Sequence, residues 1–159
     1  MTFSGEFLVG AEWFARDYAG QRVAILAAGE EAASILPEVL RTASRVTVFE
    51  EQPTWVSPVG LPLLKRTASK FYLRFAVRDA WTRRNLTPHR RFDSRKVTVN
   101  PSYYSALQNP RTRLVHWPAY AIVENGVRTA DGVEHQVDVV IVGSSSRFAD
   151  IQNSQEQIA

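Results

Sequence analysis

Side chains that could bind an anion gather in the middle of this 159-residue sequence. Residues 65–96 hold eleven of its 19 Lys and Arg residues and only two of its 16 Asp and Glu residues, although the net charge of the whole chain is only +3. Four basic side chains are each four residues apart, so on a helix they form one stripe: Arg66, Lys70, Arg74 and Arg78. Such a stripe indicates a solvated helix face, or a surface for an anionic membrane, a nucleic acid or an anionic ligand. No nucleic-acid-binding motif accompanies it, which argues against nucleic acid.

The sequence lacks the residues that several other kinds of catalytic site require. The chain has no Cys, which excludes disulfides, a thiolate nucleophile and Cys-ligated metal. Its three His residues are far apart and show no metal-ligand spacing, so we expect no metal site. The serines at 144–146 follow an apolar run but lack the G-x-S-x-G elbow of a serine nucleophile. Tyr103 and Tyr104, with Arg95, could form a polar pocket, although tyrosines in a short helix are commonly packed with their hydroxyls satisfied.

The elements that must position these residues begin with a strand and a helix. Residues 22–28 form a continuous apolar run, which is typical of a strand buried on both faces of a parallel sheet. Gly29 follows, and then a helical pattern over 30–43 in which Pro37 predicts a kink or a weakened turn. A second strand is expected over 45–49. A strand, a glycine turn, a helix and a strand within about thirty residues predict a βαβ unit.

The rest of the chain predicts a mixture of short elements. An amphipathic basic helix is expected over 61–84, after an irregular segment at 52–58. The pairs Asn125-Gly126 and Asp131-Gly132 predict the tight turns of a β-meander. The other expected elements are a short strand at 96–99, a helix at 101–107, a strand at 113–117, meander strands at 119–124, 127–130 and 133–137, and a buried strand at 138–143. The predicted fold class is α/β: a single Rossmann-like three-layer domain over 1–148 with a mainly parallel sheet and a β-meander, followed by a polar tail over 149–159.

Composition places the chain among globular proteins. Hydrophobic residues make up 45% and charged residues 22%, which excludes low-complexity disorder. No apolar run approaches the length of a membrane span, and the N-terminus lacks the basic start and apolar stretch of a signal peptide. We therefore expect a cytoplasmic protein without a transmembrane segment.

Short motifs in a fixed order give the sequence a family resemblance. They are FSG at 3–5 with Trp13, YAGQRVA at 18–24, ILPE at 35–38, VTVF at 46–49, PTW at 53–55, LTP at 86–88, YYSAL at 103–107 and TADGVEH at 129–135. In this order they resemble the NADPH-binding domain of the class B flavoprotein monooxygenases, the Baeyer–Villiger and flavin-containing monooxygenases. The resemblance implies relatives that hold FAD on one dinucleotide domain and NADPH on a second, and that transfer an oxygen atom to a ketone or heteroatom. The flanking flavin-binding segments of the family have no counterpart in this sequence, so we expect no FAD on this chain.

The resemblance places the cofactor-binding turn at residues 27–32. The family pattern Gly-x-Gly-x-Ser/Thr-Ala keeps Gly29 and Ala32 there, whereas Glu31 stands at the hydroxyl position. The arginine that pairs with the 2′-phosphate of NADPH in the family aligns with Glu51. A carboxylate at Glu51 alone favours the ribose diol of NAD. Together with Glu31, and with Ala27 at the position of the family's first glycine, it favours loss of dinucleotide binding. Acidic residues in a first helical turn also complement the helix dipole without any ligand. The implied cofactor-binding residues are thus degenerate: Gly29, Ala32 and Glu51.

Further site residues follow from the same resemblance. The Lys-Arg pair that points at the flavin and nicotinamide in the family aligns, in reversed order, with Arg95 and Lys96, and Arg and Lys are not interchangeable in planar contacts. Together with Tyr103 these two residues are the catalytic candidates. The family's fingerprint histidine aligns with Val9. The expected ligand pocket contains Trp13, Trp55 and Tyr104.

These observations leave three functions open. The favoured one is a stand-alone, degenerate descendant of the NADPH domain, a pseudoenzyme that binds a small molecule, acts as an accessory protein or has taken up non-redox chemistry. The second is the NAD(P)H-binding chain of a split flavin-dependent monooxygenase. The third is a module that binds an anionic surface through the basic helix. We expect no tightly bound cofactor, with NADP or NAD as the ones that the resemblance implies, and self-association as a homodimer or a protein partner over the face that flavin domains cover in the family.

Overall fold

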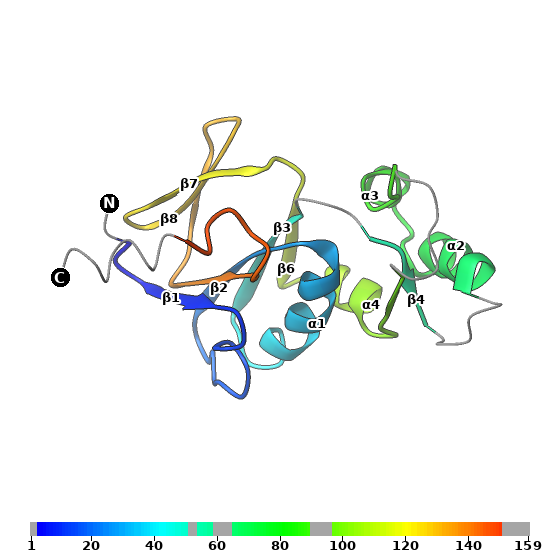
Figure 1. The fold of residues 1–159 in the computed structure, drawn as a ribbon, viewed down its shortest axis with the longest axis horizontal. Coiled ribbons are helices and arrows are strands. Elements are labelled where there is room, and N and C mark those ends of the chain that lie inside the picture. The colour runs from blue at the N-terminus through cyan, green and yellow to red at the C-terminus, as the bar shows by residue number, and fades with distance from the viewer. Residues whose placement is uncertain (1–2, 51–53, 59–64, 90–96, 151–159) are drawn as a thin grey trace.

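A five-stranded parallel sheet forms the centre of the molecule (Figure 1). The computed structural model describes residues 3–50, 54–58, 65–89 and 97–150. The strands lie in the order β1-β10-β2-β3-β6 and all neighbours are parallel. Their bounds are β1 (Glu6–Val9), β2 (Arg22–Ala27), β3 (Arg45–Glu50), β6 (Thr112–Val115) and β10 (Val139–Val142). The predicted α/β class with a mainly parallel sheet is confirmed.

Strands β2 and β10 are apolar on both faces of the sheet, as their sequences predict. Helices α1 (Gly29–Val39) and α4 (Tyr103–Leu107) cover one face. Val23 and Ile25 of β2 belong to the core on this face, whereas Ala24 and Leu26 belong to the core on the other. Because side chains alternate along a strand, a strand with neighbours on both faces must be apolar at every position.

An antiparallel meander covers the second face of the sheet. It consists of β7 (Ala119–Val123), β8 (Gly126–Thr129) and β9 (Glu134–Gln136), and contributes Ala119 and Val127 to the core there. The second predicted turn, at Asp131-Gly132, is confirmed, with Gly132 at a φ of +85°. The first is shifted by one residue, because Val123 pairs with Gly126 and the turn is therefore made by Glu124 and Asn125. Gly126 lies in the strand, where a Cβ would lie 1.9 Å from the carbonyl oxygen of His135.

The basic segment differs from the single helix predicted over 61–84. Within its described part, the structure has two helices, α2 (Lys65–Ala76) and α3 (Ala80–Asn85). Asp79 ends the continuous helix because its carboxylate accepts a hydrogen bond from the Thr82 backbone N–H, at 2.6 Å, and so caps α3. None of the helices in the described residues has the length and apolar character that crossing a bilayer requires.

The segment predicted as irregular at 52–58 also contains a short strand. This strand, β4 (Val56–Ser57), pairs in parallel with β5 (Thr98–Val99). Figure 1 shows β4, α2 and α3 together at the end of the molecule that lies away from the two termini. Helix α2 packs against both β4 and α4, so this end is joined to the sheet through α4 and α1.

Helix α1 continues through Pro37 to Val39, four residues short of the predicted end. Proline has no N–H, so Pro37 cannot bond the carbonyl oxygen of Ala33 one turn earlier. The side-chain amide of Asn100 donates to that oxygen at 2.6 Å. The weakened turn that Pro37 predicts is therefore repaired by a side chain from the segment between β5 and α4.

Candidate functional site

The predicted cofactor-binding turn lies where the carboxyl end of β2 meets the first turn of α1. Gly29 and Ala32 are both buried there. Ala28 is the N-cap of α1 and offers no side-chain hydrogen bond to the first turn. In a Rossmann-like domain a diphosphate binds at this helix N-terminus, in the crevice outside the carboxyl ends of the strands.

The side chain of Glu31 lies across this crevice. Its Oε1 accepts a hydrogen bond from the backbone N–H of Ser144, at 3.1 Å, and a second from the Ser144 hydroxyl. Its Oε2 is buried and accepts no hydrogen bond from the described residues. Glu31 thus joins the start of α1 to Ser144, just beyond the end of β10. Strand β10 is far from β2 in the chain but adjacent to it in the sheet.

Gly143 makes room for this carboxylate. A Cβ at Gly143 would lie 2.0 Å from Oε2 of Glu31 and 2.9 Å from the Cβ of Ala27. Contacts this short cannot be accommodated without a shift of Glu31. The carboxylate therefore lies directly against the backbone at the ends of β2 and β10.

The residues at this turn do not fit the diphosphate of a dinucleotide. Gly29 and Ala32 are small enough for the backbone to approach one, but Glu31 brings a negative charge and already uses the backbone and hydroxyl donors of Ser144. Two unit charges about 4 Å apart repel by about 4 kcal/mol at an effective dielectric constant of about 20. That corresponds to roughly a thousandfold in affinity.

The structure describes only some of the other predicted site residues. Glu51, Arg95 and Lys96 fall outside the described residues. Tyr103 and Tyr104 are buried in α4, with their ring centroids 5.7 Å apart, and the ring of Tyr104 lies 4.9 Å from that of Tyr72. Both tyrosines thus form part of the core between α4 and its neighbours.

The three residues of the predicted ligand pocket belong to or pack against the same core, but they come from different segments. Trp13 lies in the turn after β1, where its carbonyl oxygen accepts a hydrogen bond from the Tyr18 hydroxyl at 2.6 Å. Tyr104 is in the core. Trp55 directly precedes β4 and lines a cavity.

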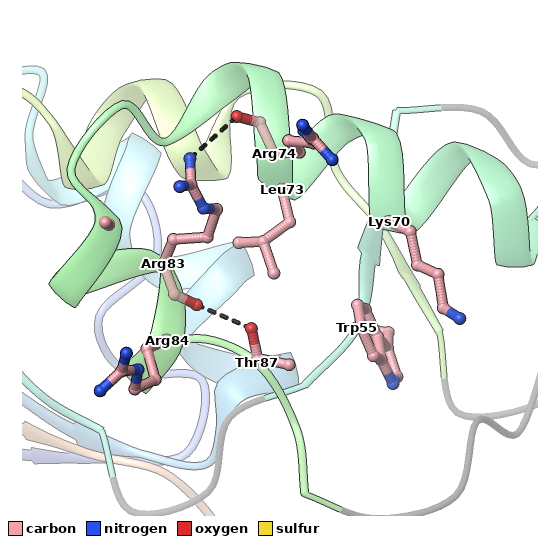
Figure 2. A pocket seen from close by; sticks show the side chains of 8 residues that line it. Trp55, Lys70, Leu73, Arg74, Arg83, Arg84 and Thr87 are labelled. Carbon is pink, nitrogen blue, oxygen red and sulfur yellow. Dashed lines mark hydrogen bonds between the residues drawn. The ribbon is translucent and has the colours of Figure 1, made fainter.

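The cavity beside Trp55 lies between β4, α2 and α3 and has a volume of about 580 Å³ (Figure 2). Its lining residues are Trp55, Lys70, Leu73, Arg74, Ala80, Arg83, Arg84 and Thr87. Four of these eight side chains are cationic and none is acidic. The Asp79 carboxylate, next to Ala80 in the chain, is engaged in capping α3, and its pKa is lowered by hydrogen bonds from Thr82.

A second cavity, of about 480 Å³, follows the edge strand β6. It contains His116 and His135, and burial lowers the pKa of both imidazoles. Because of this shift both side chains favour the neutral form. Within the described ranges no three His, Asp or Glu side chains gather into a group that could hold a metal ion.

Sequence reasoning missed two parts of these sites. It did not pair Glu31 with Ser144, although both follow strands whose carboxyl ends meet at one edge of the sheet, and that signal was present. It also left Arg83 and Arg84 on one long helix with the basic stripe. The Asp79 cap, an N-cap residue directly before a helical run, is the signal that separates them.

Comparison of sequences relates this chain to flavin-dependent monooxygenases. It is 24% identical to a Baeyer–Villiger monooxygenase of Streptomyces coelicolor over 193 aligned positions, which cover 94% of this chain and 37% of the relative. It is 20% identical to a Baeyer–Villiger monooxygenase of Pseudomonas aeruginosa, with 90% of this chain and 35% of the relative covered. No family model matches the chain. The chain therefore spans little more than a third of these relatives.

Solved structures show the same fold. A steroid monooxygenase bound to NADP superimposes with a TM-score of 0.77 at 15% identity, covering 96% of this chain and 44% of that one. An open form of cyclohexanone monooxygenase gives a TM-score of 0.75 at 18% identity, covering 95% and 45%. The five-stranded sheet and the meander thus correspond to a Rossmann-like domain within these larger enzymes. The chain is homologous to the class B flavoprotein monooxygenases over one of their domains.

Proposed function

We propose that this domain does not bind a pyridine dinucleotide at the α1 turn, and that it serves as a ligand-binding or accessory domain without redox chemistry of its own. The observation that carries the proposal is the Glu31 carboxylate on the backbone N–H and hydroxyl of Ser144. The relatives supply the contrast, since one of them was solved with NADP bound.

A bound diphosphate would compete with the Glu31 carboxylate for the same hydrogen-bond donors. The Ser144 donors at this edge of the sheet are already bonded to Glu31. Because the fold holds Glu31 in place, its carboxylate loses no translational or rotational entropy there, whereas a free diphosphate would. A diphosphate would have to displace this carboxylate or bind beside it. Displacement loses the hydrogen bonds to Ser144, and binding alongside adds the charge repulsion estimated above.

Titration calorimetry with NADPH and NADH tests the proposal. We expect no saturable binding to the wild-type protein at sub-millimolar dinucleotide. The variant Glu31→Thr restores the hydroxyl of the family pattern and removes the charge, and should bind at least one of the two dinucleotides measurably. Glu30→Thr is the matched control, because it removes an exposed charge from the same helical turn and should behave like the wild type.

Two results would contradict this function. One is a sub-millimolar dissociation constant of either dinucleotide for the wild-type protein. The other is equal improvement by Glu30→Thr and Glu31→Thr, which would assign the effect to overall charge.

We also propose that the domain associates with itself. The support is exposed apolar surface on α2, where the rings of Phe71 and Phe75 stack with their centroids 5.9 Å apart. Paired aromatic rings of this kind are typical of a surface that another protein surface covers.

A further inference from the structure

We propose that the cavity between β4, α2 and α3 binds a small aromatic anion, with a carboxylate, sulfonate or phosphate group held by arginine and lysine and an aromatic ring against Trp55. The inference goes beyond the proposed function, because it assigns a site and a ligand class. It rests on the part of that proposal that makes this a ligand-binding domain, and does not depend on Glu31.

The charge of the cavity calls for an anion. Lys70 and Arg74 line it from α2, and Arg83 and Arg84 line it from α3; Figure 2 shows from which helix each side chain comes. None of the ion pairs found among the described residues involves any of these four side chains. Four cations around one opening repel one another and create a positive potential there. A bound negative group relieves this repulsion, which raises the affinity of the cavity for anions.

One of the cations is held in position by the protein. The Arg83 guanidinium donates through Nη1 to the backbone carbonyl oxygens of Arg74, at 3.3 Å, and Val77, at 3.2 Å. These contacts fix the plane of the guanidinium against the end of α2 and leave Nε and Nη2 for other acceptors. A guanidinium fixed in this way loses little entropy when it binds a carboxylate or phosphate in a bidentate manner.

The remaining wall is apolar and aromatic. Leu73 is buried beneath the cavity, and Figure 2 shows its side chain directed from α2 toward the space between α3 and Trp55. The half-buried Trp55 forms the opposite side. A volume of about 580 Å³ lies within the range of sites for small organic molecules, so a ligand with one ring system and one acidic group matches both the size and the chemistry.

Fluorescence titration with 8-anilinonaphthalene-1-sulfonate tests this site, with N-phenyl-1-naphthylamine as the uncharged analogue. Arg84→Gln should weaken sulfonate binding by about tenfold and leave the neutral analogue unaffected. Trp55→Leu should weaken both probes. Arg66→Gln is the matched control: it lies on the basic stripe of α2 but outside the cavity, and should change neither probe by more than about twofold.

Arg83→Gln should act like Arg84→Gln, but Arg83 also bonds the backbone at the end of α2. Arg84 is exposed, so its variant keeps the test valid if Arg83→Gln fails to fold. Equal losses with Arg66→Gln and Arg84→Gln would overturn the proposal in favour of a diffuse cationic surface, such as one that docks on anionic lipid. Binding that ignores both Trp55→Leu and Arg84→Gln would overturn it as well.

The same titration in Glu31→Thr separates this proposal from the previous one. The sulfonate affinity should be unchanged in that variant, because Glu31 and the cavity share no contact residue. A failed probe titration therefore leaves the dinucleotide result standing, and a wild-type protein that binds NADPH at the α1 turn leaves the cavity result standing.

Discussion

Gly143 and Glu31 are a matched pair at the end of the central strands. A Cβ at position 143 would overlap Oε2 of Glu31, so Gly143→Ala must either move the carboxylate or distort the strand end. Overpacking of this kind costs about 1–3 kcal/mol. We expect the free energy of unfolding of Gly143→Ala, measured by urea denaturation, to fall by that amount.

The second variant of this pair provides the control. In a Glu31→Ala background the nearest clash is gone, so Gly143→Ala should cost clearly less there than in the wild type. Equal costs in both backgrounds would mean that Ala27, whose Cβ is the next contact at 2.9 Å, and not Glu31, dictates the glycine.

Arg22 and Asp138 join the beginnings of β2 and β10. Asp138 accepts bonds from Nε of Arg22 at 3.0 Å, from Nη2 at 2.8 Å and from the Arg22 backbone N–H at 2.8 Å. Hydrogen bonds from Arg22 lower the pKa of the Asp138 carboxyl. Because both side chains are more than a third exposed, solvent screening reduces their contribution, and Asp138→Asn should cost only about 1 kcal/mol at neutral pH.

The pH dependence of this pair has a definite sign. A lowered folded-state pKa means that the unfolded carboxyl binds its proton first, at about pH 3.9. The stabilisation is complete above that pH and is lost as the pH falls through the folded-state pKa. The difference in unfolding free energy between wild type and Asp138→Asn should thus be constant from pH 5 to 7 and shrink below about pH 4. A difference that persists at lower pH would show that the charge of the carboxylate is not its source.

At the residue scale, the sequence shows that Glu31 departs from the family pattern of the cofactor-binding turn, which has a hydroxyl residue at that position. It does not identify the partner of Glu31, because Ser144 lies 113 residues away and only the sheet order brings the two together. The same limit applies to Tyr103 and Tyr104, which are candidates by residue type but are buried in the core.

Among the elements, helix α1 depends on a residue outside itself. Asn100 donates to the Ala33 carbonyl that Pro37 leaves without a partner, and also accepts a hydrogen bond from the Ser102 backbone N–H at 2.9 Å. Asn100→Ala should therefore lower the free energy of unfolding by about 1–3 kcal/mol, because a part-buried carbonyl loses its donor. Chemical denaturation measures the loss.

A double-mutant cycle shows whether the repair of α1 is the cause. Pro37→Ala restores the backbone N–H that bonds Ala33, so Asn100→Ala should cost less in that background. If the two costs add without coupling, Asn100 acts through Ser102 and the start of α4, and the explanation for Pro37 is wrong.

The elements that the sequence predicts well are those whose burial leaves a local pattern. The continuous apolar runs of β2 and β10 are examples, as are the helical spacing of α1 and the turn at Gly132. The two-residue strand β5 lies within the strand predicted over 96–99. Its partner β4 forms only because these distant segments pair, and no local pattern marks it. Asp79 signals the break between α2 and α3, but the four-residue spacing of basic side chains runs past the end of α2 to Arg78 and favours one helix.

At the scale of the whole molecule, the α1 turn and the Trp55 cavity lie in different parts of the fold. The sheet, α1 and the meander preserve the domain seen in the larger monooxygenases. The Trp55 cavity lies at the other end, formed by β4, α2 and α3. Separation of the two sites means that a change at the α1 turn need not disturb the cavity, and a new ligand can be accepted there while the core of the fold is kept.

The proposed self-association is decided at this scale. Phe71 and Phe75 are 54% and 72% exposed, and burying two such rings against a second copy contributes about 1.5–3 kcal/mol for each ring. We expect static light scattering to give a mass that rises with concentration toward a dimer for the wild type, and a monomer mass for the double variant Phe71→Ser and Phe75→Ser. Trp117→Ser removes another exposed aromatic, 56% exposed beyond the end of β6, and should leave the wild-type behaviour intact. A wild-type protein that stays monomeric at every concentration would contradict self-association, because the dimer should form whenever the concentration of this protein alone is high enough. The two rings would then remain in water or contact a different protein.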